Sequence, residues 1–379
     1  MKAHHPKLEL PPPPGLYVHI PFCRSKCPYC AFYSITSRSL IPRWLDALQQ
    51  EIRHYEGRFN RFDSLYLGGG TPTILAEPEL ARLIEDLFAH FDFAPDSEIT
   101  IEANPSDLTV EKINMLQDLG VNRISLGIQS FDDRILSFLG RRHTGKEAEN
   151  AMRKLRSSGF QNIGVDLMYA FTGQSMGDWM DTLRQAIGFQ PEHLSCYQLS
   201  IEKQTPFGRL AEKGLFHSLS EAEESLYFLT TSEFLEDQGY VHYEISNFAR
   251  HKTCYSRHNQ KYWHHVPYLG LGPSAHSFDG SSRWWNVRSI KKYCEHLQGG
   301  KAPIEGYENL TDEQLRIESI ALGLRTMQGV DLDKIAHNPQ ANKTIPGLEE
   351  SGLVQLKDNR VIPTKKGFLV ADRLAVECA

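Results

Sequence analysis

The sequence has no long apolar run. No stretch approaches the roughly 18 apolar residues that a helix needs to cross a bilayer, and the segment from Met1 to Pro6 lacks the apolar core of a signal peptide. An excess of positive charge is also lacking, because the net charge is -6. Nucleic acid is therefore not expected as a partner, since backbone phosphates require a basic surface. We expect a cytoplasmic protein and leave peripheral contact with a membrane open.

Cysteines are few, and a second closely spaced cysteine pair is missing. The chain has seven cysteines in 379 residues. A structural zinc site usually needs four ligands in two such pairs, and a disulfide framework needs an oxidising compartment and adds little to a chain of this length. A dinucleotide-binding G-x-G-x-x-G sequence is not found after any expected strand, which disfavours a doubly wound nucleotide-binding fold.

Three of the seven cysteines nevertheless lie within eight residues. Cys23, Cys27 and Cys30 have the spacing C-x3-C-x2-C, with Arg24 and Lys26 between them. Positive neighbours favour the thiolate, which is the form that binds metal. Three thiolates can hold three corners of a cubic iron–sulfur cluster, and the fourth iron then stays open to a small molecule. Zinc and inert thiols are the weaker alternatives.

Apolar segments with strand character alternate with helical stretches through the first half of the chain. The expected strands share a position directly before a helical segment and cover residues 16–20, 64–67, 98–102, 123–129, 162–169 and 193–201. Such alternation predicts an α/β fold with a parallel sheet. Right-handed crossovers would curl the sheet into a barrel or an arc of one, and a doubly wound open sheet is the alternative.

The composition divides the chain into four parts. An N-terminal tail over residues 1–15 contains the prolines 11–14, a barrel covers 16–215, a connecting region covers 216–306, and a C-terminal domain covers 307–379. In the connecting region we expect a helix begun by Ser220 and a strand over 240–248. In the C-terminal domain, two helices, a hairpin turning at 358–359 and a last helix predict a winged-helix-like module. Because the chain is acidic, we expect this module to have a structural role or to contact another protein rather than to bind DNA.

Polar residues follow several expected strands at their carboxyl ends. The cysteines come after the first strand, Gly68 to Thr71 after the second, and Glu102 and Gln129 end the third and fourth. Ligands gather at this edge in barrels and in open α/β sheets alike. The glycines would let the backbone approach a ligand and offer N–H groups as donors; a tight turn is the simpler alternative.

The cysteine motif, placed after Tyr17-Val-His-Ile-Pro-Phe22, resembles that of the radical S-adenosylmethionine (radical SAM) superfamily. Within it, the chain resembles the branch of oxygen-independent coproporphyrinogen oxidases and HemW-type heme chaperones. The resemblance implies a partial (βα)6 TIM-type barrel with a C-terminal winged-helix-like α+β module. It also implies a [4Fe-4S] cluster whose open iron binds S-adenosylmethionine (SAM), and whose electron can split SAM into methionine and a 5′-deoxyadenosyl radical.

The resemblance also assigns residues to the cofactors. Cys23, Cys27 and Cys30 would hold the cluster. The residues that match positions around the cluster and SAM are Tyr17, Tyr29, Gly69, Gly70, Thr71, Glu102, Gln129, Arg141 and Asp166. One loop departs from the family, which commonly has Gly-Leu-Pro-Gly-Gln where this chain has Ala170-Phe-Thr-Gly-Gln174. We therefore expect that loop to follow another path.

Three features favour the chaperone branch. The oxidases have a further cysteine where this chain has Phe32, and His258-Asn-Gln-Lys-Tyr-Trp263 matches the H-N-x-x-Y-W mark of the chaperones. Only 22 residues precede Cys23, fewer than the oxidases generally carry. The expected function is binding of heme and its transfer to an acceptor protein, without oxidase activity. The alternatives are oxidative decarboxylation of coproporphyrinogen III and a heme-opening radical methyltransferase.

The heme site itself rests on one residue. His258 could offer an axial ligand to heme iron, beside the flat rings of Tyr262 and Trp263. The alternative is a His–Asn hydrogen-bonded pair under a small aromatic core. The partners expected are heme and heme-accepting proteins, with membrane respiratory enzymes among the candidates. A homodimer and the cleavage of SAM in the cell stay open.

Overall fold

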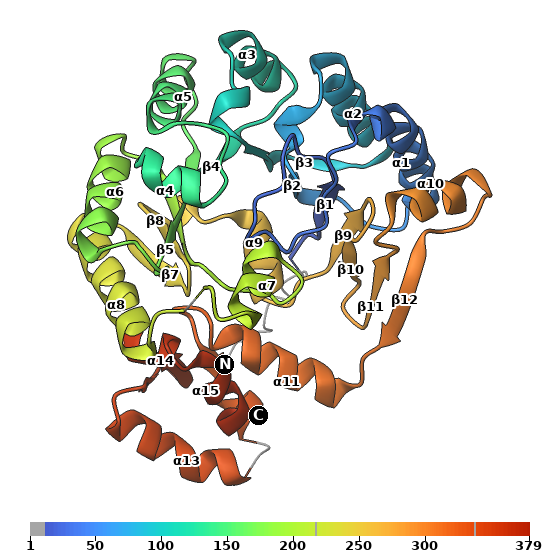
Figure 1. Ribbon diagram of the computed structural model, residues 1–379. Helices are drawn as coiled ribbons and strands as arrows, with labels where there is room; N and C mark the ends of the chain where they lie inside the picture. The colour runs from blue at the N-terminus through green and yellow to red at the C-terminus, as the bar shows by residue number, and fades with distance from the viewer. Residues whose placement is uncertain (1–11, 217, 337–338) are drawn as a thin grey trace.

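A parallel sheet, curved into an incomplete barrel, forms the centre of the computed structural model, which describes residues 12–216, 218–336 and 339–379 (Figure 1). Most of the expected N-terminal tail, residues 1–11, lies outside the described part. Six strands pair in parallel in chain order: β1 (Gly15–Ile20), β2 (Phe62–Gly69), β3 (Phe93–Ala103), β4 (Arg123–Gln129), β5 (Ile163–Tyr169) and β6 (His193–Gln198). The predicted partial (βα)6 barrel is therefore confirmed.

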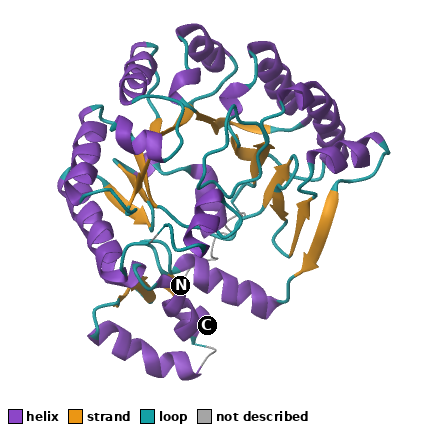
Figure 2. Cartoon of the chain, viewed as in Figure 1, coloured by secondary structure: helices purple, strands orange, loops and turns teal. Residues whose placement is uncertain are grey.

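Helices cover the outer face of this arc (Figures 1 and 2). Between the strands the chain forms α1 (Ile41–Tyr55), α2 (Glu77–His90), α3 (Val110–Asp118), α4 (Asp133–Phe138), α5 (Gly145–Ser157) and α6 (Met176–Gly188). Short 3-10 turns are η1 (Arg38–Leu40), η2 (Pro72–Ile74), η3 (Pro105–Asp107) and η4 (Lys252–Cys254). The helices turn side chains such as Trp44 and Leu83 toward the strands, where these side chains are almost fully buried. One continuous apolar core thus joins the sheet to its helices.

The sheet continues past the barrel at both edges and has twelve strands within the described chain. Beyond β1 lie β9 (Tyr268–Leu271), β10 (His276–Phe278), β11 (Ser282–Asn286) and β12 (Ile304–Asn309); beyond β6 lie β8 (Asn247–Ala249) and β7 (Val241–Glu244). Only β9 among these is parallel to its barrel neighbour. The single strand expected over 240–248 was wrong, because the chain turns back between β7 and β8 and forms an antiparallel pair.

Four further helices lie in the chain between β6 and β12: α7 (Pro206–Glu212), α8 (Glu221–Asp237), α9 (Arg257–Trp263) and α10 (Ile290–Gln298). α9 lies inside the arc and contacts β1 and β2 (Figure 1). The Glu98 carboxylate accepts hydrogen bonds from the backbone N–H groups of Arg257 and His258, at 3.1 and 3.2 Å. An anion at a helix N-terminus is favourable. Because its contacts are with residues at the starts of the strands, α9 lies at the amino end of the barrel.

The C-terminal module has its own apolar core, which includes Ile320, Val354 and Leu374. Its elements are α11 (Asp312–Gly323), β13 (Val330–Asp331), α12 (Leu332–Ile335), α13 (Pro339–Glu350), β14 (Val354–Lys357), β15 (Arg360–Pro363), α14 (Lys365–Phe368) and α15 (Ala371–Cys378). The predicted hairpin is confirmed: β14 and β15 are antiparallel, and Asp358 and Asn359 have φ of 51° and 58°, as the tight hairpin turn requires. A third strand, β13, pairs with β15.

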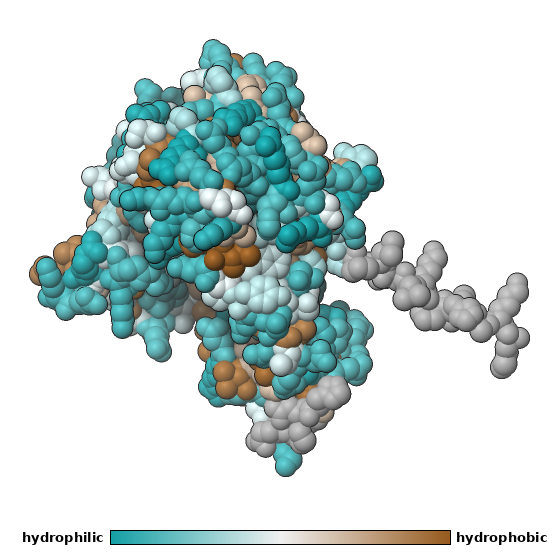
Figure 3. Space-filling model, turned by 90° about the vertical axis from the view of Figure 1, so that its right-hand side faces the viewer, coloured by the Kyte–Doolittle hydropathy of each residue, from teal (hydrophilic) through white to brown (hydrophobic). Residues whose placement is uncertain are grey.

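The surface shows how the chain meets its surroundings. In the described part of the chain, no helix combines the length and the apolar character that crossing a bilayer would take. The face drawn in Figure 3 is mostly hydrophilic, and its hydrophobic residues form small, separate patches. Isolated apolar residues of this kind are ordinary on a protein surface.

Candidate functional site

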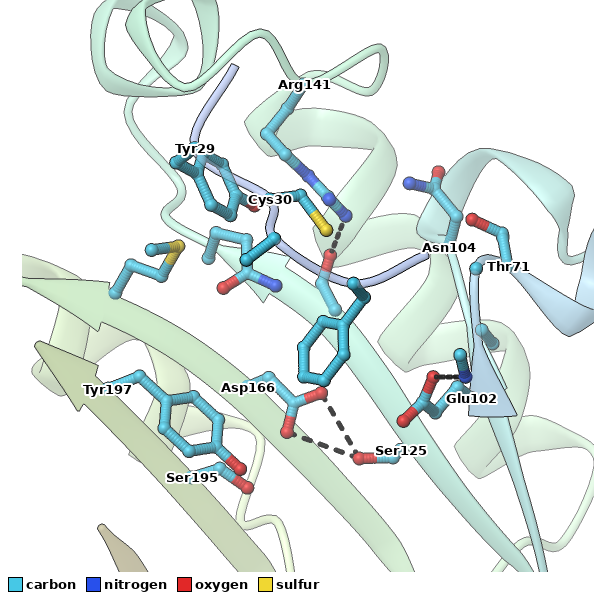
Figure 4. A pocket seen from close by; sticks show the side chains of 18 of the residues that line it. Tyr29, Cys30, Thr71, Glu102, Asn104, Ser125, Arg141, Asp166, Ser195 and Tyr197 are labelled. Atoms are coloured by element: carbon cyan, nitrogen blue, oxygen red, sulfur yellow. Dashed lines mark hydrogen bonds between the residues drawn. The ribbon is translucent and has the colours of Figure 1, made fainter. Parts of the chain in front are cut away.

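A cavity of about 530 Å³ opens inside the barrel (Figure 4). Alternate residues of β4 face it: Arg123, Ser125, Gly127 and Gln129 all line the cavity. This follows from the strand period of two, which turns every second residue to the same side. The strands therefore present one level of side chains near their carboxyl ends and a second level deeper in the barrel.

The cysteine loop lies at the rim of this cavity, between β1 and η1. Backbone hydrogen bonds close the loop at its base, from Cys23 N to Ile35 O at 2.9 Å and from Ile35 N to Pro21 O at 2.8 Å. Cys23, Cys27 and Cys30 are partly exposed, and all three line a smaller cavity of about 70 Å³ that shares Cys30 with the larger one. The loop thus brings three sulfurs to one small space beside the main cavity.

Two distant segments hold the loop in place at Pro28. The N–H of Phe207, at the start of α7, donates a hydrogen bond to Pro28 O at 3.0 Å. Gly140 also packs against Pro28: its φ is 64°, and a Cβ at that position would lie 2.7 Å from Cδ of Pro28. The chain needs glycine there both for the left-handed backbone and for the close approach.

The donors around the sulfurs fit a cluster. Thr71 Oγ1 donates to Cys23 Sγ at 3.6 Å, and Arg141 Nη1 donates to Cys27 Sγ at 3.5 Å. A hydroxyl and a cation directed at sulfur stabilise the thiolate over the thiol. Among the described residues, no three His, Cys, Asp or Glu side chains are grouped so that they could hold one metal ion. Two observations therefore indicate that these residues fit a cluster. Three thiols share one cavity, and Thr71 and Arg141 donate hydrogen bonds to two of them.

The glycine run at the end of β2 serves close packing. A Cβ on Gly69 would lie 2.6 Å from the His19 ring, and a Cβ on Gly70 would lie 2.6 Å from Phe22 O. The interpretation that these N–H groups are free donors was wrong. Gly69 N donates to Glu102 Oε2, Gly70 N to Ile20 O and Thr71 N to Phe22 O, at 2.8 to 3.1 Å. The run brings β2 against the base of the cysteine loop and leaves the Thr71 hydroxyl at the cavity.

Two partly buried carboxyl groups face the cavity from β3 and β5 (Figure 4). Glu102 accepts hydrogen bonds from Tyr66 OH at 2.9 Å and from Gly69 N at 3.1 Å. Asp166 accepts from Ser125 Oγ at 3.2 Å. Burial, and then the negative charge of Asp166, raise the pKa of Glu102 to about 7; burial also raises the pKa of Asp166. Both groups are acceptors of the kind that ribose hydroxyls need.

Gln129 comes to the same rim from the end of β4, and Arg141 comes to it from the loop after α4. Arg141 Nη2 donates to Gly127 O at 2.7 Å, while Nη1 reaches Cys27. Gln129 has φ of 68°, and the pairing of β4 with β5 shifts its register between Gly127 and Gln129. This irregularity places the Gln129 side chain at the cavity.

The structure brings the remaining predicted cofactor residues to the same place. Tyr17 and Tyr29 line the main cavity, together with Gly69, Gly70 and Thr71. Tyr17 OH lies 3.0 Å from His19 Nδ1, deeper in the barrel than the cysteine loop. The loop 170–174 is not among the segments that line the cavity. Within it, Ala170 has φ of 60°, a conformation that favours glycine.

His258 lies apart from the rim, on α9 at the amino end of the barrel. It is 1% exposed, its Nδ1 lies 3.2 Å from Ser64 Oγ, and its Nε2 lies 2.9 Å from Tyr262 OH. Burial lowers the pKa of His258 to about 3. Both ring nitrogens already have partners, so neither is free to bind iron in this arrangement. The structure thus favours a packing role under the aromatic rings of Tyr17 and Tyr66.

Sequence reasoning missed part of the cavity wall. The residues in question line the deeper level or the far side: Arg123, Ser125, Asn104, Met168, Ser195, Tyr197 and Phe32. A signal was available for most of them, because Arg123 and Ser125 on β4 and Ser195 and Tyr197 on β6 alternate with apolar residues. Polar residues at every second position of a strand buried on both faces indicate a polar lumen.

The chain matches two known families. The radical SAM superfamily matches residues 17–186, and the HemN C-terminal domain matches residues 310–370. Among solved structures, the coproporphyrinogen III oxidase HemN from Escherichia coli, a radical SAM enzyme, has a TM-score of 0.82 and 25% identity, over 98% of this chain and 91% of that chain. The barrel with its three-cysteine loop is therefore of the radical SAM class.

Curated relatives show to which family within the radical SAM class the chain belongs. The heme chaperone HemW of Bacillus subtilis (strain 168) is 33% identical over 369 residues, which cover 94% of this chain and 97% of the relative. The heme chaperone HemW of Escherichia coli (strain K12) is 36% identical over 274 residues, 70% of each chain. The chain belongs to the HemW family, as the sequence predicted.

Proposed function

We propose that this protein is a heme chaperone of the radical SAM class, which binds a [4Fe-4S] cluster, SAM and heme and passes the heme to an acceptor protein. The observation that carries the proposal is the cavity inside the barrel, with three thiols on one loop at its rim and the partly buried carboxyls of Glu102 and Asp166 in its wall. The relatives that match almost the whole chain are named heme chaperones, which supports heme as the cargo.

Cys23, Cys27 and Cys30 would hold three irons of the cluster. When bound, the cluster supplies an open iron for SAM and a single electron. The protein orients the sulfurs through Thr71 and Arg141, which donate hydrogen bonds to Cys23 and Cys27. The base of the loop, closed by backbone hydrogen bonds, keeps the three thiols on the side of the cavity.

The polar wall of the cavity would bind SAM. Glu102 and Asp166 would accept hydrogen bonds from the ribose hydroxyls, because each carboxyl lines the cavity with acceptor capacity left. Arg141 would pair with the methionine carboxylate, since its guanidinium lies between the cysteine loop and the end of β4. Tyr17, Tyr29, Gln129 and the run Gly69 to Thr71 would complete the pocket.

The rival function is oxidative decarboxylation of coproporphyrinogen III, as in the structurally similar oxidase. One of the residues that distinguish the two functions lies at the cavity: the oxidases have a cysteine where this chain has Phe32, which lines the cavity and is 69% exposed. A phenyl ring at that place cannot supply a thiol, whether as a ligand or as a donor. The structure therefore offers an apolar face where the oxidase resemblance requires sulfur.

One set of measurements tests the function. The full chain is reconstituted with iron and sulfide without oxygen, titrated with hemin, and then mixed with membranes whose respiratory enzymes lack heme. We expect saturable hemin binding, transfer of heme to the membranes, and no decarboxylation of coproporphyrinogen III. Turnover of coproporphyrinogen III to protoporphyrinogen, or no hemin binding by the reconstituted chain, would refute the proposal.

A further inference from the structure

Asn104 stands where the main cavity meets the smaller cavity that holds the sulfurs. A few residues line both spaces and form the neck between them: Tyr29, Cys30, Gly70, Thr71, Asn104 and Arg141. A ligand that reaches from the main cavity to an iron held by the three cysteines must pass through this neck. Its polar groups therefore decide which end of a ligand can approach the metal.

The orientation of the Asn104 amide is fixed. Asn104 is 6% exposed, and its Oδ1 accepts hydrogen bonds from Ser106 N at 3.1 Å and Ser106 Oγ at 2.9 Å. Because a backbone N–H can only donate, the amide oxygen must face Ser106 and the amide nitrogen must point away from it. Figure 4 shows the amide beside Thr71, with its nitrogen on the side of Arg141. That nitrogen makes no hydrogen bond to another residue of the described chain.

The segment that carries Asn104 is held from several sides. Thr73 Oγ1 accepts a hydrogen bond from Asn104 N at 3.3 Å and donates one to Asp107 Oδ2 at 3.1 Å. The Asp107 side chain is 1% exposed and also pairs with Arg142 and, at 3.6 Å, with Arg24. These contacts join η3 to the cysteine loop and to the loop after α4. The free amide N–H groups are thus in place before a ligand arrives, which lowers the entropic cost of binding.

The charges near the neck favour an anionic group. The smaller cavity is lined by Lys26, Arg141 and Arg142, and no carboxyl group of the described chain lines it. Its anionic groups are the three cysteine thiolates, each of which would be bound to iron. Glu102 and Asp166 line the main cavity alone. SAM has matching ends, because its ribose carries hydroxyl groups and its methionine part carries a carboxylate.

We propose that Asn104 Nδ2 donates a hydrogen bond to the methionine carboxylate of SAM in the neck, opposite Arg141. This inference rests on the proposed function and adds a residue to its SAM site. A carboxylate has more acceptor sites than one guanidinium can fill, so a second donor is useful there. Asn104 is then a specificity residue, because an adenine nucleoside without the amino acid part gains nothing from it.

The test compares two ligands by equilibrium dialysis against the full, anaerobically reconstituted chain. One is SAM, and the other is 5′-methylthioadenosine, which lacks the amino acid part. Asn104→Ser keeps an oxygen near Ser106 N and removes the amide donor, so SAM binding should weaken roughly tenfold. Asn104→Asp keeps the size and places a negative oxygen in the neck, so SAM binding should weaken further. Binding of 5′-methylthioadenosine should stay unchanged in both variants.

Asn150→Asp, which adds the same charge at an exposed position of α5, is the matched control and should bind both ligands as the unchanged chain does. Iron content and thermal unfolding show whether each variant is folded and holds its cluster. Asn104→Ser adds no charge beside the sulfurs, so this variant decides the question if Asn104→Asp loses iron.

The outcomes separate the two claims. If the unchanged, reconstituted chain does not bind SAM, the proposed function itself fails. If that chain binds SAM and the Asn104 variants bind it equally well, this inference is overturned while the proposed function stands. An equal loss of SAM and 5′-methylthioadenosine also overturns the inference, because Asn104 would then only shape the cavity. A loss confined to SAM supports a contact with its amino acid part.

Discussion

Arg141 donates a hydrogen bond from Nη1 to Cys27 Sγ over 3.5 Å, although 114 positions separate the two residues in the chain. The same guanidinium donates from Nη2 to Gly127 O at 2.7 Å. One side chain therefore connects the cysteine loop with the end of β4. Any ligand bound between these two segments must meet this cation.

Replacing Arg141 by lysine tests its role toward SAM. Lysine carries the charge but cannot make two parallel hydrogen bonds from one planar group. We expect Arg141→Lys to weaken SAM binding roughly tenfold in equilibrium dialysis, with the iron content unchanged. Arg153→Lys, at an exposed site on α5, is the control. Equal SAM affinity in the two variants would remove Arg141 from the binding site.

The cluster assignment predicts which cysteines carry iron. Single substitutions Cys23→Ser, Cys27→Ser and Cys30→Ser should each lower the iron and sulfide content well below the about four irons per chain of a [4Fe-4S] cluster. Cys254→Ser, which removes a partly exposed thiol on η4, should leave the content unchanged. Zinc in place of iron in the anaerobically prepared protein would contradict the assignment.

Gly70 should be intolerant of any side chain. A Cβ there would lie 2.6 Å from Phe22 O, which directly precedes Cys23. We expect Gly70→Ala to lower the free energy of unfolding by about 1–3 kcal/mol and to reduce iron content, because the base of the cysteine loop must move. Gly188→Ala at the end of α6 has no heavy atom within 4 Å of the added carbon and should be near neutral. Similar unfolding curves for the two variants would refute the packing argument.

Glu51 gives a pH dependence of stability. This fully buried carboxyl on α1 accepts hydrogen bonds from Tyr293 OH, Gly272 N and Asn286 Nδ2, at 2.5 to 2.8 Å. Burial nevertheless raises its pKa from 4.5 to about 7. The folded state thus keeps a proton that the unfolded state releases between these values, so the free energy of unfolding falls as pH rises from 4.5 to 7 and then levels.

The size of that effect can be measured against a variant. The shift corresponds to at most about 3 kcal/mol. Glu51→Gln is uncharged at every pH, so the loss of stability between pH 5 and pH 8 should be smaller than in the unchanged protein by that order. Denaturant unfolding at both pH values gives the comparison, and Glu85→Gln at an exposed position of α2 is the control. An unaltered pH dependence in Glu51→Gln would show that Glu51 ionises normally.

Ala170 offers a gain of stability. Its φ of 60° is costly for alanine and free for glycine. We expect Ala170→Gly to raise the free energy of unfolding by about 0.5–1 kcal/mol, after the greater chain entropy of glycine is subtracted. The same change in a helix, Ala151→Gly on α5, should lower it by about 1 kcal/mol. A loss of stability at both sites would mean that the backbone at Ala170 is not left-handed in solution.

Local patterns were enough to predict the barrel strands and the hairpin. The predicted bounds of β4, Arg123 to Gln129, agree with the structure, because apolar residues alternate there between clear turn signals. The T-x-x-E sequence at Thr144, which is the usual form of a capping box, does form one at the start of α5. Signals of this kind depend on residues that are close in the chain.

Other features depend on partners that are distant in the chain, and the sequence alone could not show them. The strands β7 to β12 have three to six residues each, and their place in the sheet follows from which edges the barrel leaves open. The N–H groups of Gly70 and Thr71 seemed free because Ile20 and Phe22, which accept their hydrogen bonds, lie some 50 residues earlier. His258 likewise seemed available until Ser64 and Tyr262 were placed beside it.

The position of α9 has a consequence for how sequences of this kind can diverge. One side of this helix meets the barrel interior, where Asn259 lines the cavity, and another meets α11 of the C-terminal module. Directly after it, His265 pairs with Glu318 at 3.3 Å. A substitution on α11 that displaces α9 therefore also changes the floor of the cavity. Substitutions in the interior of the barrel and at the far end of the chain therefore restrict one another through this one helix.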